Sequence, residues 1–247
     1  MTKLTRHQAR NDAGYSLLEV MIAMVIASAV LGIVTSAMIG MLKSGASANS
    51  RLANLDTVRT SVDVLSKNLR TAIRPEQLNP SCSASCGSAF EVGADKQAIF
   101  YANVGDKAGT ALAPTRITYT IAVDPKDTTG TTAMLTETRQ QVASSWTSGD
   151  YIWAGGTVAN PCPFGGVPGC VTRTVSRGIT WPLPASNGPL FTYYDGSGVV
   201  IATTPTPTAS TLAQISSVRI ALPVGDTTHP SPGVTTSVFL PNSTLGH

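Results

Sequence analysis

Glu19 is the residue whose charge most clearly needs a partner, because its carboxylate lies at the start of an uninterrupted apolar run. From Val20 to Leu42 the chain has 23 residues without a charged side chain, and roughly 20 apolar residues suffice to span a bilayer as a helix. An ionisable group at membrane depth is costly unless it is paired. This position therefore calls for an ion pair, with a positive group supplied nearby.

Side chains suited to catalysis are scarce. His229 and His247 are the only histidines after residue 14, and no Gly-x-Ser-x-Gly, P-loop or His-Glu-x-x-His motif occurs. We therefore do not expect an enzyme. The stretch Asp195-Gly196-Ser197-Gly198 could offer oxygen ligands to a calcium ion, but a β-turn explains the same residues and is preferred. No cofactor is expected.

The stretch Ala13-Gly14-Tyr15-Ser16-Leu17-Leu18-Glu19 lies between a basic leader and the apolar run. It resembles the processing site of type IV prepilins and of type II secretion pseudopilins. In that family a prepilin peptidase cuts after the glycine, on the cytoplasmic side, and methylates the new N-terminal amine. The resemblance implies a cut between Gly14 and Tyr15, with Tyr15 standing where the family usually has Phe.

The resemblance also implies a partner for Glu19. In the family the acid of one subunit meets the N-terminal amine of its neighbour and sets the register of assembly. The α-amine of Tyr15 would stay cationic after methylation, with an unperturbed pKa of about 8. Without it, Glu19 would be an unpaired charge in an apolar filament core. The alternative is that Glu19 only reaches the lipid headgroups.

Two other interpretations of the apolar run are open. Ala27-Ser28-Ala29 has the small-x-small form that a signal peptidase accepts, but the apolar run continues for thirteen residues past Ala29. A plain signal anchor leaves Glu19 unexplained. We therefore expect a leader over 1–14 that is removed, and a transmembrane or filament-core helix over 15–42.

The helix is expected to continue as an amphipathic segment over 43–74. Apolar residues recur there at steps of three or four, with charged residues between them, namely Leu52, Leu55, Val58, Val62, Leu65, Leu69 and Ile73. No proline occurs between Tyr15 and Arg74, and Pro75 supplies a stop. The sequence therefore predicts one helix from about Ser16 to Arg74.

After Pro75 the pattern changes to the alternation typical of strands. Short β-branched or aromatic runs, separated by turn signals, lie at 97–104, 116–123, 132–139, 170–176, 190–195, 199–202, 215–222 and 234–240. The stretch 203–210 (TTPTPTAS) is expected to be an extended connector. A long helix followed by many strands predicts an α+β fold, with the helix packed on a mainly antiparallel sheet within 75–247.

The four cysteines are interpreted through the orientation that the resemblance implies. With the leader in the cytoplasm, the residues after 43 lie across the membrane, where disulfides persist. Of the three connectivities that four cysteines allow, we favour Cys82 with Cys86 and Cys162 with Cys170, because each pair closes a small loop rich in Pro, Gly or Ser. The Cys-x3-Cys and Cys-x7-Cys spacings match zinc ribbons poorly, so no metal is expected.

Composition gives no sign of a nucleic-acid partner, because only 13% of residues are charged and the net charge of +3 has no block of one sign. The sequence is similar to the larger minor pilins of the W type and to J-type pseudopilins in a YYDGSG hairpin followed by ISSVRIAL and TTSVFLPN. Pro241-Asn242 stands where the last strand of those proteins often ends in Arg-Asn.

The expected function is that of a structural subunit, a minor pilin of a type IV pilus-like filament involved in priming, assembly or tip function. It would lie in the bacterial cytoplasmic membrane with its C-terminal domain outside the cytoplasm, and later in the filament or at the cell surface. Its expected partners are the prepilin peptidase, other pilin subunits and the assembly platform. The alternatives are a pseudopilin of a type II secretion or DNA-uptake system, and an uncleaved membrane-anchored β-rich binding module.

Overall fold

The computed structural model describes residues 16–79, 81–82, 86–104, 113–143, 149–155, 162, 166–183, 188–225 and 230–242. The chain divides into two compact units, Met1–Ser50 and Arg51–His247. The helix α1 (Leu17–Arg70) contributes its first part to one unit and its last part to the other. The two units are described in turn.

The N-terminal unit consists, in its described part, of Ser16 and the first part of α1. Its described side chains are exposed, including those of large apolar residues such as Leu17 (82% exposed) and Met41 (76% exposed). Leu17–Ala46 is long and apolar enough to cross a membrane. At 1.5 Å per residue this segment is about 45 Å long, more than the roughly 30 Å of a bilayer's hydrocarbon core.

In the second unit, the last part of α1 is amphipathic, as the spacing predicts. Val58, Val62, Leu65 and Leu69 are buried. Leu52 is 65% exposed, so the buried stripe does not begin there as expected. Leu55 packs against the edge of the core and is the first residue of the stripe to do so.

The helix ends at Arg70 and not at Arg74, which corrects the predicted boundary. The N–H of Ala72 still donates to the carbonyl of Leu69 at 2.9 Å, but the N–H of Ile73 donates to the carbonyl of Tyr101 at 2.9 Å. The helix ends here because the carbonyl of Thr71 and the N–H of Ile73 form hydrogen bonds with the segment around Tyr101 instead of within the helix. Pro75 does not act as the stop; it opens the short 3-10 helix η1 (Pro75–Gln77).

The strands form an antiparallel sheet, which confirms the α+β fold. Its members in the described residues are β1 (Phe90–Ala94), β2 (Gln97–Ala102), β3 (Thr115–Val123), β4 (Thr132–Gln140), β5 (Cys170–Thr180), β6 (Phe191–Tyr194), β7 (Val200–Ile201), β8 (Ser217–Gly225) and β9 (Pro230–Phe239). Their order is β1-β2-β3-β4-β5-β8-β6-β7, with β9 paired to β8. β1 is absent from the predicted strands. The predicted connector at 203–210 is partly helical, because α2 (Ala209–Leu212) begins inside it.

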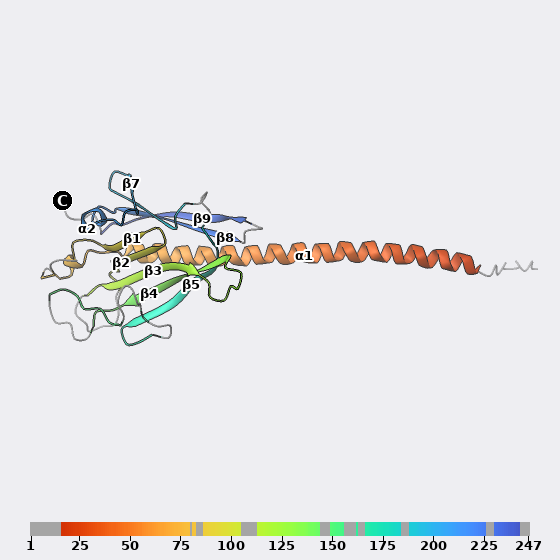
Figure 1. Ribbon diagram of the computed structural model, residues 1–247, viewed down its shortest axis with the longest axis horizontal. Coiled ribbons are helices and arrows are strands. Elements are labelled where there is room, and N and C mark those ends of the chain that lie inside the picture. Colours follow the sequence, from red (N-terminus) through yellow and green to blue (C-terminus); the bar gives the residue numbers. More distant parts are fainter. Residues whose placement is uncertain are drawn as a thin grey trace, which may run out of the picture. The chain divides into compact units, whose positions relative to one another are not determined.

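The sheet has two parts, and strand pairing joins them at a single pair of residues. β5 pairs with β4 along its length but with β8 only at Ile179 and Val224, in the register of the described strands. β8 pairs more extensively with β6 and β9. Strands β1–β5 and strands β6–β9 are seen as separate groups in Figure 1.

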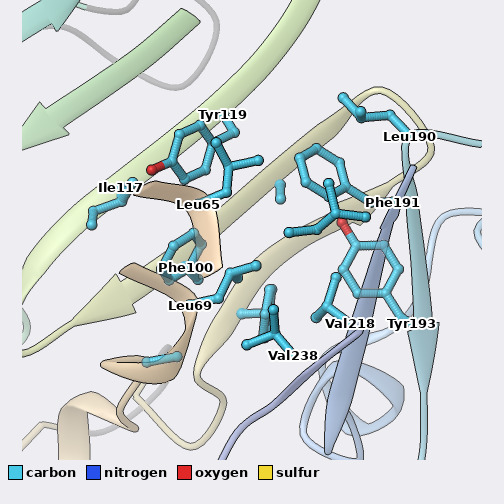
Figure 2. Packing of buried hydrophobic residues seen from close by; sticks show 14 of the residues in the cluster. Leu65, Leu69, Phe100, Ile117, Tyr119, Leu190, Phe191, Tyr193, Val218 and Val238 are labelled. Carbon is cyan, nitrogen blue, oxygen red and sulfur yellow. The ribbon is translucent and has the colours of Figure 1, made fainter. Parts of the chain in front are cut away.

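The core forms where the amphipathic part of α1 meets both groups of strands. Figure 2 shows Leu65 and Leu69 of α1 among side chains from the two groups, including Phe100, Ile117 and Tyr119 from β2 and β3, and Phe191, Tyr193, Val218 and Val238 from β6, β8 and β9. Burial of each large apolar side chain contributes about 1.5–3 kcal/mol. The helix therefore holds the two groups together by a shared apolar surface.

A buried polar cluster also ties α1 to the sheet. Glu137 of β4 is fully buried and accepts hydrogen bonds from the Tyr119 hydroxyl at 2.5 Å and from Asn68 Nδ2 of α1 at 3.0 Å. Arg139 Nε and Arg173 Nε donate to its other oxygen at 2.6 and 2.9 Å. The carboxylate is fully paired, as a buried charge must be.

Candidate processing and assembly site

The residues assigned to processing and assembly lie at the start of the chain. Gly14 and Tyr15 fall outside the described residues, so the cut itself is not placed. Ser16 and Glu19 are described, Ser16 just before α1 and Glu19 in its first turn. The structure therefore describes the helix side of the site.

Ser16 is the N-cap of α1. Its Oγ accepts a hydrogen bond from the N–H of Leu18 at 3.3 Å, and its carbonyl accepts from the N–H of Glu19 at 2.9 Å. Ser16-x-x-Glu19 has the spacing of a capping box, and an acid in the first turn interacts favourably with the helix dipole. This capping role was not predicted from the sequence, although a serine followed three residues later by an acid is a signal for it.

The surroundings of Glu19 are apolar and open. Shallow grooves of about 360 and 520 Å³ lie beside it. They are lined, besides Ser16 and Glu19, by Leu18, Val20, Ile22, Ala23, Met24, Ile26 and Ala27. None of these lining residues carries a positive charge, and no ion pair of Glu19 occurs within the part of the chain that the structure describes.

The hydroxyl groups farther along the apolar segment are satisfied locally. Thr35 Oγ1 donates to the carbonyl of Leu31 at 2.8 Å, and Ser36 Oγ donates to that of Gly32 at 2.9 Å. Ser28 Oγ donates to the carbonyl of Met24. Such bonds to the preceding turn let a hydroxyl enter an apolar medium. Glu19 differs from these side chains because its charge needs a partner from elsewhere.

The four cysteines form two disulfides, Cys82–Cys86 and Cys162–Cys170, with Cα–Cα distances of 5.9 and 5.8 Å. Cys82 Sγ lies 3.5 Å from Asp150 Oδ1, so these three residues form a group with potential ligand atoms. The sulfurs are bonded to each other, however, and a cysteine binds a metal as a free thiolate. In this oxidised form the group has a structural role.

The described segment 149–155 lies close to the Cys82–Cys86 disulfide at its first end and to the Cys162–Cys170 disulfide at its last end. Asn79 Nδ2 donates to the carbonyl of Gly149 at 2.7 Å. At the other end, Gly155 has φ of 82°, and a Cβ there would lie 2.6 Å from Cys170 Sγ. Only glycine fits such a close approach without strain. Between these ends, Trp153 stacks on Tyr101 of β2 with ring centroids 5.4 Å apart.

The other residues considered for chemistry are in turns or lie outside the described residues. Asp195 Oδ1 accepts hydrogen bonds from the N–H groups of Ser197 and Val199 at 2.8 and 2.9 Å, which is the geometry of a turn. This arrangement occupies one oxygen of the carboxylate considered for calcium. His229 and His247 are outside the described residues.

Residues 9–35 match the family model described as the prokaryotic N-terminal methylation motif. The chain carries a prepilin-type N-terminus. The match contains Gly14, Tyr15 and Glu19 together with the start of α1, and it confirms the resemblance seen in the sequence. Comparisons with curated proteins and with solved structures found no match. A prepilin-type N-terminus implies membrane anchoring through the apolar helix, processing by a prepilin peptidase and assembly with pilin subunits in general.

Proposed function

We propose that the protein is a minor pilin, a non-enzymatic structural subunit of a type IV pilus-like filament that acts in priming, assembly or at the tip. The observation that carries the proposal is the prepilin-type motif at 9–35, which extends into a helix whose apolar side chains are exposed over Leu17–Ala46. An exposed apolar helix needs either lipid or other apolar helices around it. A membrane-inserted precursor and an assembled filament supply these two environments in turn.

Processing would create the positive partner of Glu19. Hydrolysis of the Gly14–Tyr15 peptide bond releases residues 1–14 and leaves a free α-amine on Tyr15, which remains cationic after methylation. The described residues beside Glu19 are apolar, so a neighbouring subunit's amine would meet the carboxylate in a medium of low dielectric. A charge pair is strong there and an unpaired charge is costly, so the pair would fix the axial register of assembly.

The unit Arg51–His247 would be the part displayed outside the cytoplasm. It has its own core, built from the amphipathic end of α1 and the antiparallel sheet. Its two disulfides suit an oxidising compartment.

The test is the intact mass and N-terminal sequence of the membrane-extracted protein, made with and without an active prepilin peptidase. We expect a methylated Tyr15 start that is lost when the peptidase is inactive. Gly14→Val should leave the Met1 start, whereas Ala13→Val, one residue upstream, should still be cut. A Met1 start in the presence of active peptidase, or a Val30 start after Ala27-Ser28-Ala29, would contradict the proposal.

A second measurement separates the pilin from the alternatives. Mechanical shearing of cells should release a pilin with the surface filaments, whereas a pseudopilin of a secretion or DNA-uptake system should stay with the cells. An uncleaved anchored binding module predicts that Glu19→Ala leaves its function unchanged.

A further inference from the structure

The outer edge of β9 is a long strand edge without a neighbour in the described part of the sheet. β9 pairs with β8 on one side, and no described strand pairs with it on the other. The other edges are short or covered. β7 has two residues, the N–H of Phe191 donates to the carbonyl of Asp95 beside β1, and Ser61 Oγ of α1 donates to the carbonyl of Val175 in β5.

The second half of β9 lacks the usual protection of an edge strand. Natural edges carry charges, prolines or bulges that discourage the addition of another strand. Pro230, Pro232 and a shift in register with β8 lie at the start of β9, but Val234-Thr235-Thr236-Ser237-Val238-Phe239 contains no charge, no proline and no such shift. A segment that is β-branched, uncharged and at an edge favours pairing with another strand.

The hydrogen-bonding direction of this edge can be assigned. The N–H of Leu240 donates to the carbonyl of Ser216, so that residue faces β8. Backbone groups alternate in direction along a strand. Val238, Thr236 and Val234 therefore also face β8, and the pairing from Ser217–Phe239 to Leu222–Val234 is regular. The N–H and C=O groups of Phe239, Ser237 and Thr235 point outward from the sheet edge, whereas Gly233 lies where the register with β8 shifts.

The sequence of this edge is complementary to itself about Thr236. In an antiparallel pair centred there, Val234 faces Val238 of a second copy, and Thr235 faces Ser237 of that copy. Val238 is buried and Val234 half-buried on one face of the sheet, while Thr235 and Ser237 are exposed on the other. Valine–valine and hydroxyl–hydroxyl pairs across strands are both favourable.

The same register gives the exposed aromatic side chain of β9 a partner. Phe239 is 63% exposed and would lie opposite Gly233 of the second copy. An aromatic ring laid across a cross-strand glycine covers backbone that would otherwise be exposed. In this register the residues with outward backbone groups in the regular part of the strand, Thr235 and Ser237, also face one another, so about four backbone hydrogen bonds can form.

We propose that β9 is a self-association surface that pairs antiparallel with β9 of a second copy, with a two-fold axis through Thr236. Such an interface is isologous, with the same patch on both subunits. The two-fold axis reverses the strand direction, so the contact joins subunits that approach from opposite ends, as on two separate filaments, and not neighbours that share one direction. The proposal is independent of the N-terminal processing and can be tested on the full chain.

The first test places a cysteine on the axis. Thr236→Cys has its sulfur opposite the same residue of the second copy, at a Cα–Cα distance of about 4.5 Å that permits a disulfide. The described cysteines are all in disulfides, so the new thiol is distinguishable. We expect the oxidised chain in detergent to run as a covalent dimer on non-reducing gels. Val199→Cys, at a site 61% exposed, is the control and should give at least about tenfold less dimer.

A second test fixes the register. A mixture of Thr235→Cys protein and Ser237→Cys protein should cross-link, whereas either variant alone should cross-link weakly because the matching cysteine lies two residues away. Stronger dimer formation by Thr235→Cys alone than by Thr236→Cys would overturn the proposed register.

A third test adds a charge to the edge. Ser237→Lys in the Thr236→Cys background should lower the dimer yield at least about tenfold, because a lysine on an edge opposes strand addition. Val199→Lys in the same background should leave the yield unchanged. Detergent micelles also hold apolar helices together, so only a cross-link at β9 supports the proposal. Equal cross-linking by Val199→Cys, no cross-linking by Thr236→Cys, or an adduct to a different protein in its place would overturn it.

Discussion

Glu19 and Glu137 are both glutamates in largely apolar surroundings, but only one has its partners within the described chain. Glu137 is fully buried and accepts hydrogen bonds from Tyr119, Asn68, Arg139 and Arg173. Glu19 is exposed among apolar side chains and has no described ion pair. A buried carboxylate must be paired. The sheet unit meets that requirement by itself, whereas under the proposed function the partner of Glu19 comes from a neighbouring subunit.

The two parts of α1 differ in the same way. Its first part has exposed apolar side chains and hydroxyls bonded to its own backbone, such as Thr35 to Leu31. Its last part buries one stripe and directs polar side chains to the sheet, such as Asn68 to Glu137 and Ser61 to the carbonyl of Val175. The last part of α1 therefore packs on a sheet of the same chain, whereas the apolar side chains of its first part need an apolar environment from outside the chain.

The largest expected effect comes from removing the charge of Glu19. Glu19→Gln keeps the size of the side chain and should lower incorporation into sheared filaments at least about tenfold, because the charge pair is lost in a medium of low dielectric. The unfolding midpoint of the sheet unit should not change, since Glu19 belongs to the other compact unit. Normal incorporation of Glu19→Gln would remove the assembly role of this carboxylate.

The next effect tests the boundary between the two parts of α1. Leu65→Ala should lower the free energy of unfolding by about 3 kcal/mol, because Leu65 is fully buried and its truncation leaves a cavity. Leu52→Ala is the matched control. It should change stability by less than about 0.5 kcal/mol, because Leu52 is 65% exposed. Urea unfolding of the full chain in detergent measures both, and similar losses would mean that the stripe extends farther than the structure indicates.

Local patterns predicted most of the fold. The apolar run, the stripe from Leu55 to Leu69 and most strands follow from periodicities of 3.6 and 2. The errors lie where tertiary pairing decides. The end of α1 depends on a hydrogen bond from the N–H of Ile73 to the carbonyl of Tyr101. β1 has the alternation of a strand at Phe90, Val92 and Ala94, but it is short, contains Gly93 and shifts register between Phe90 and Val92, so its pairing with β2 decides it.

Residues that are close together in the sequence could be predicted, but clusters that form only on folding could not. Gly14, Tyr15 and Glu19 could be assigned to the candidate site because the motif is contiguous in the sequence. The capping role of Ser16 could have been predicted from its spacing to Glu19. The Glu137 cluster could not be found in the same way. Its members come from distant parts of the chain, and only the packing of α1 on β3, β4 and β5 brings them together.

A smaller effect is expected from Glu137→Gln, about 2 kcal/mol of lost stability in urea unfolding. The amide keeps the shape of the side chain but turns one of its acceptors into a donor that faces Tyr119 or an arginine. Arg173 is half-exposed and can reach water, which limits the loss. Asp63→Asn serves as the control because the Asp63 side chain is exposed and belongs to no ion pair among the described residues, so its change should be close to zero.

The smallest effect is the pH dependence of stability that the same cluster produces. Burial by itself would raise the pKa of Glu137, but hydrogen bonds from Arg173, Tyr119 and Arg139 outweigh it and hold this pKa below its usual value. Between the lowered folded pKa and the ordinary unfolded pKa of about 4.3, the unfolded chain binds more protons, so stability is present above that range and is lost as pH falls through it.

At alkaline pH the sign is reversed, because burial and then the charge of Glu137 raise the pKa of Tyr119 well above its usual value. Tyr119 of the unfolded chain loses its proton above about pH 10 while the folded chain keeps it, so stability should fall as pH rises from there. Urea midpoints measured from pH 3 to pH 11 should therefore form a plateau with losses at both ends. Glu137→Gln should make the acid limb shallower, and Tyr119→Phe should make the alkaline limb shallower. The pKa of Asp127 is also lowered and those of Tyr101 and Tyr193 are also raised, so part of each limb should remain. Unchanged limbs in these variants would place the titrating groups elsewhere in the chain.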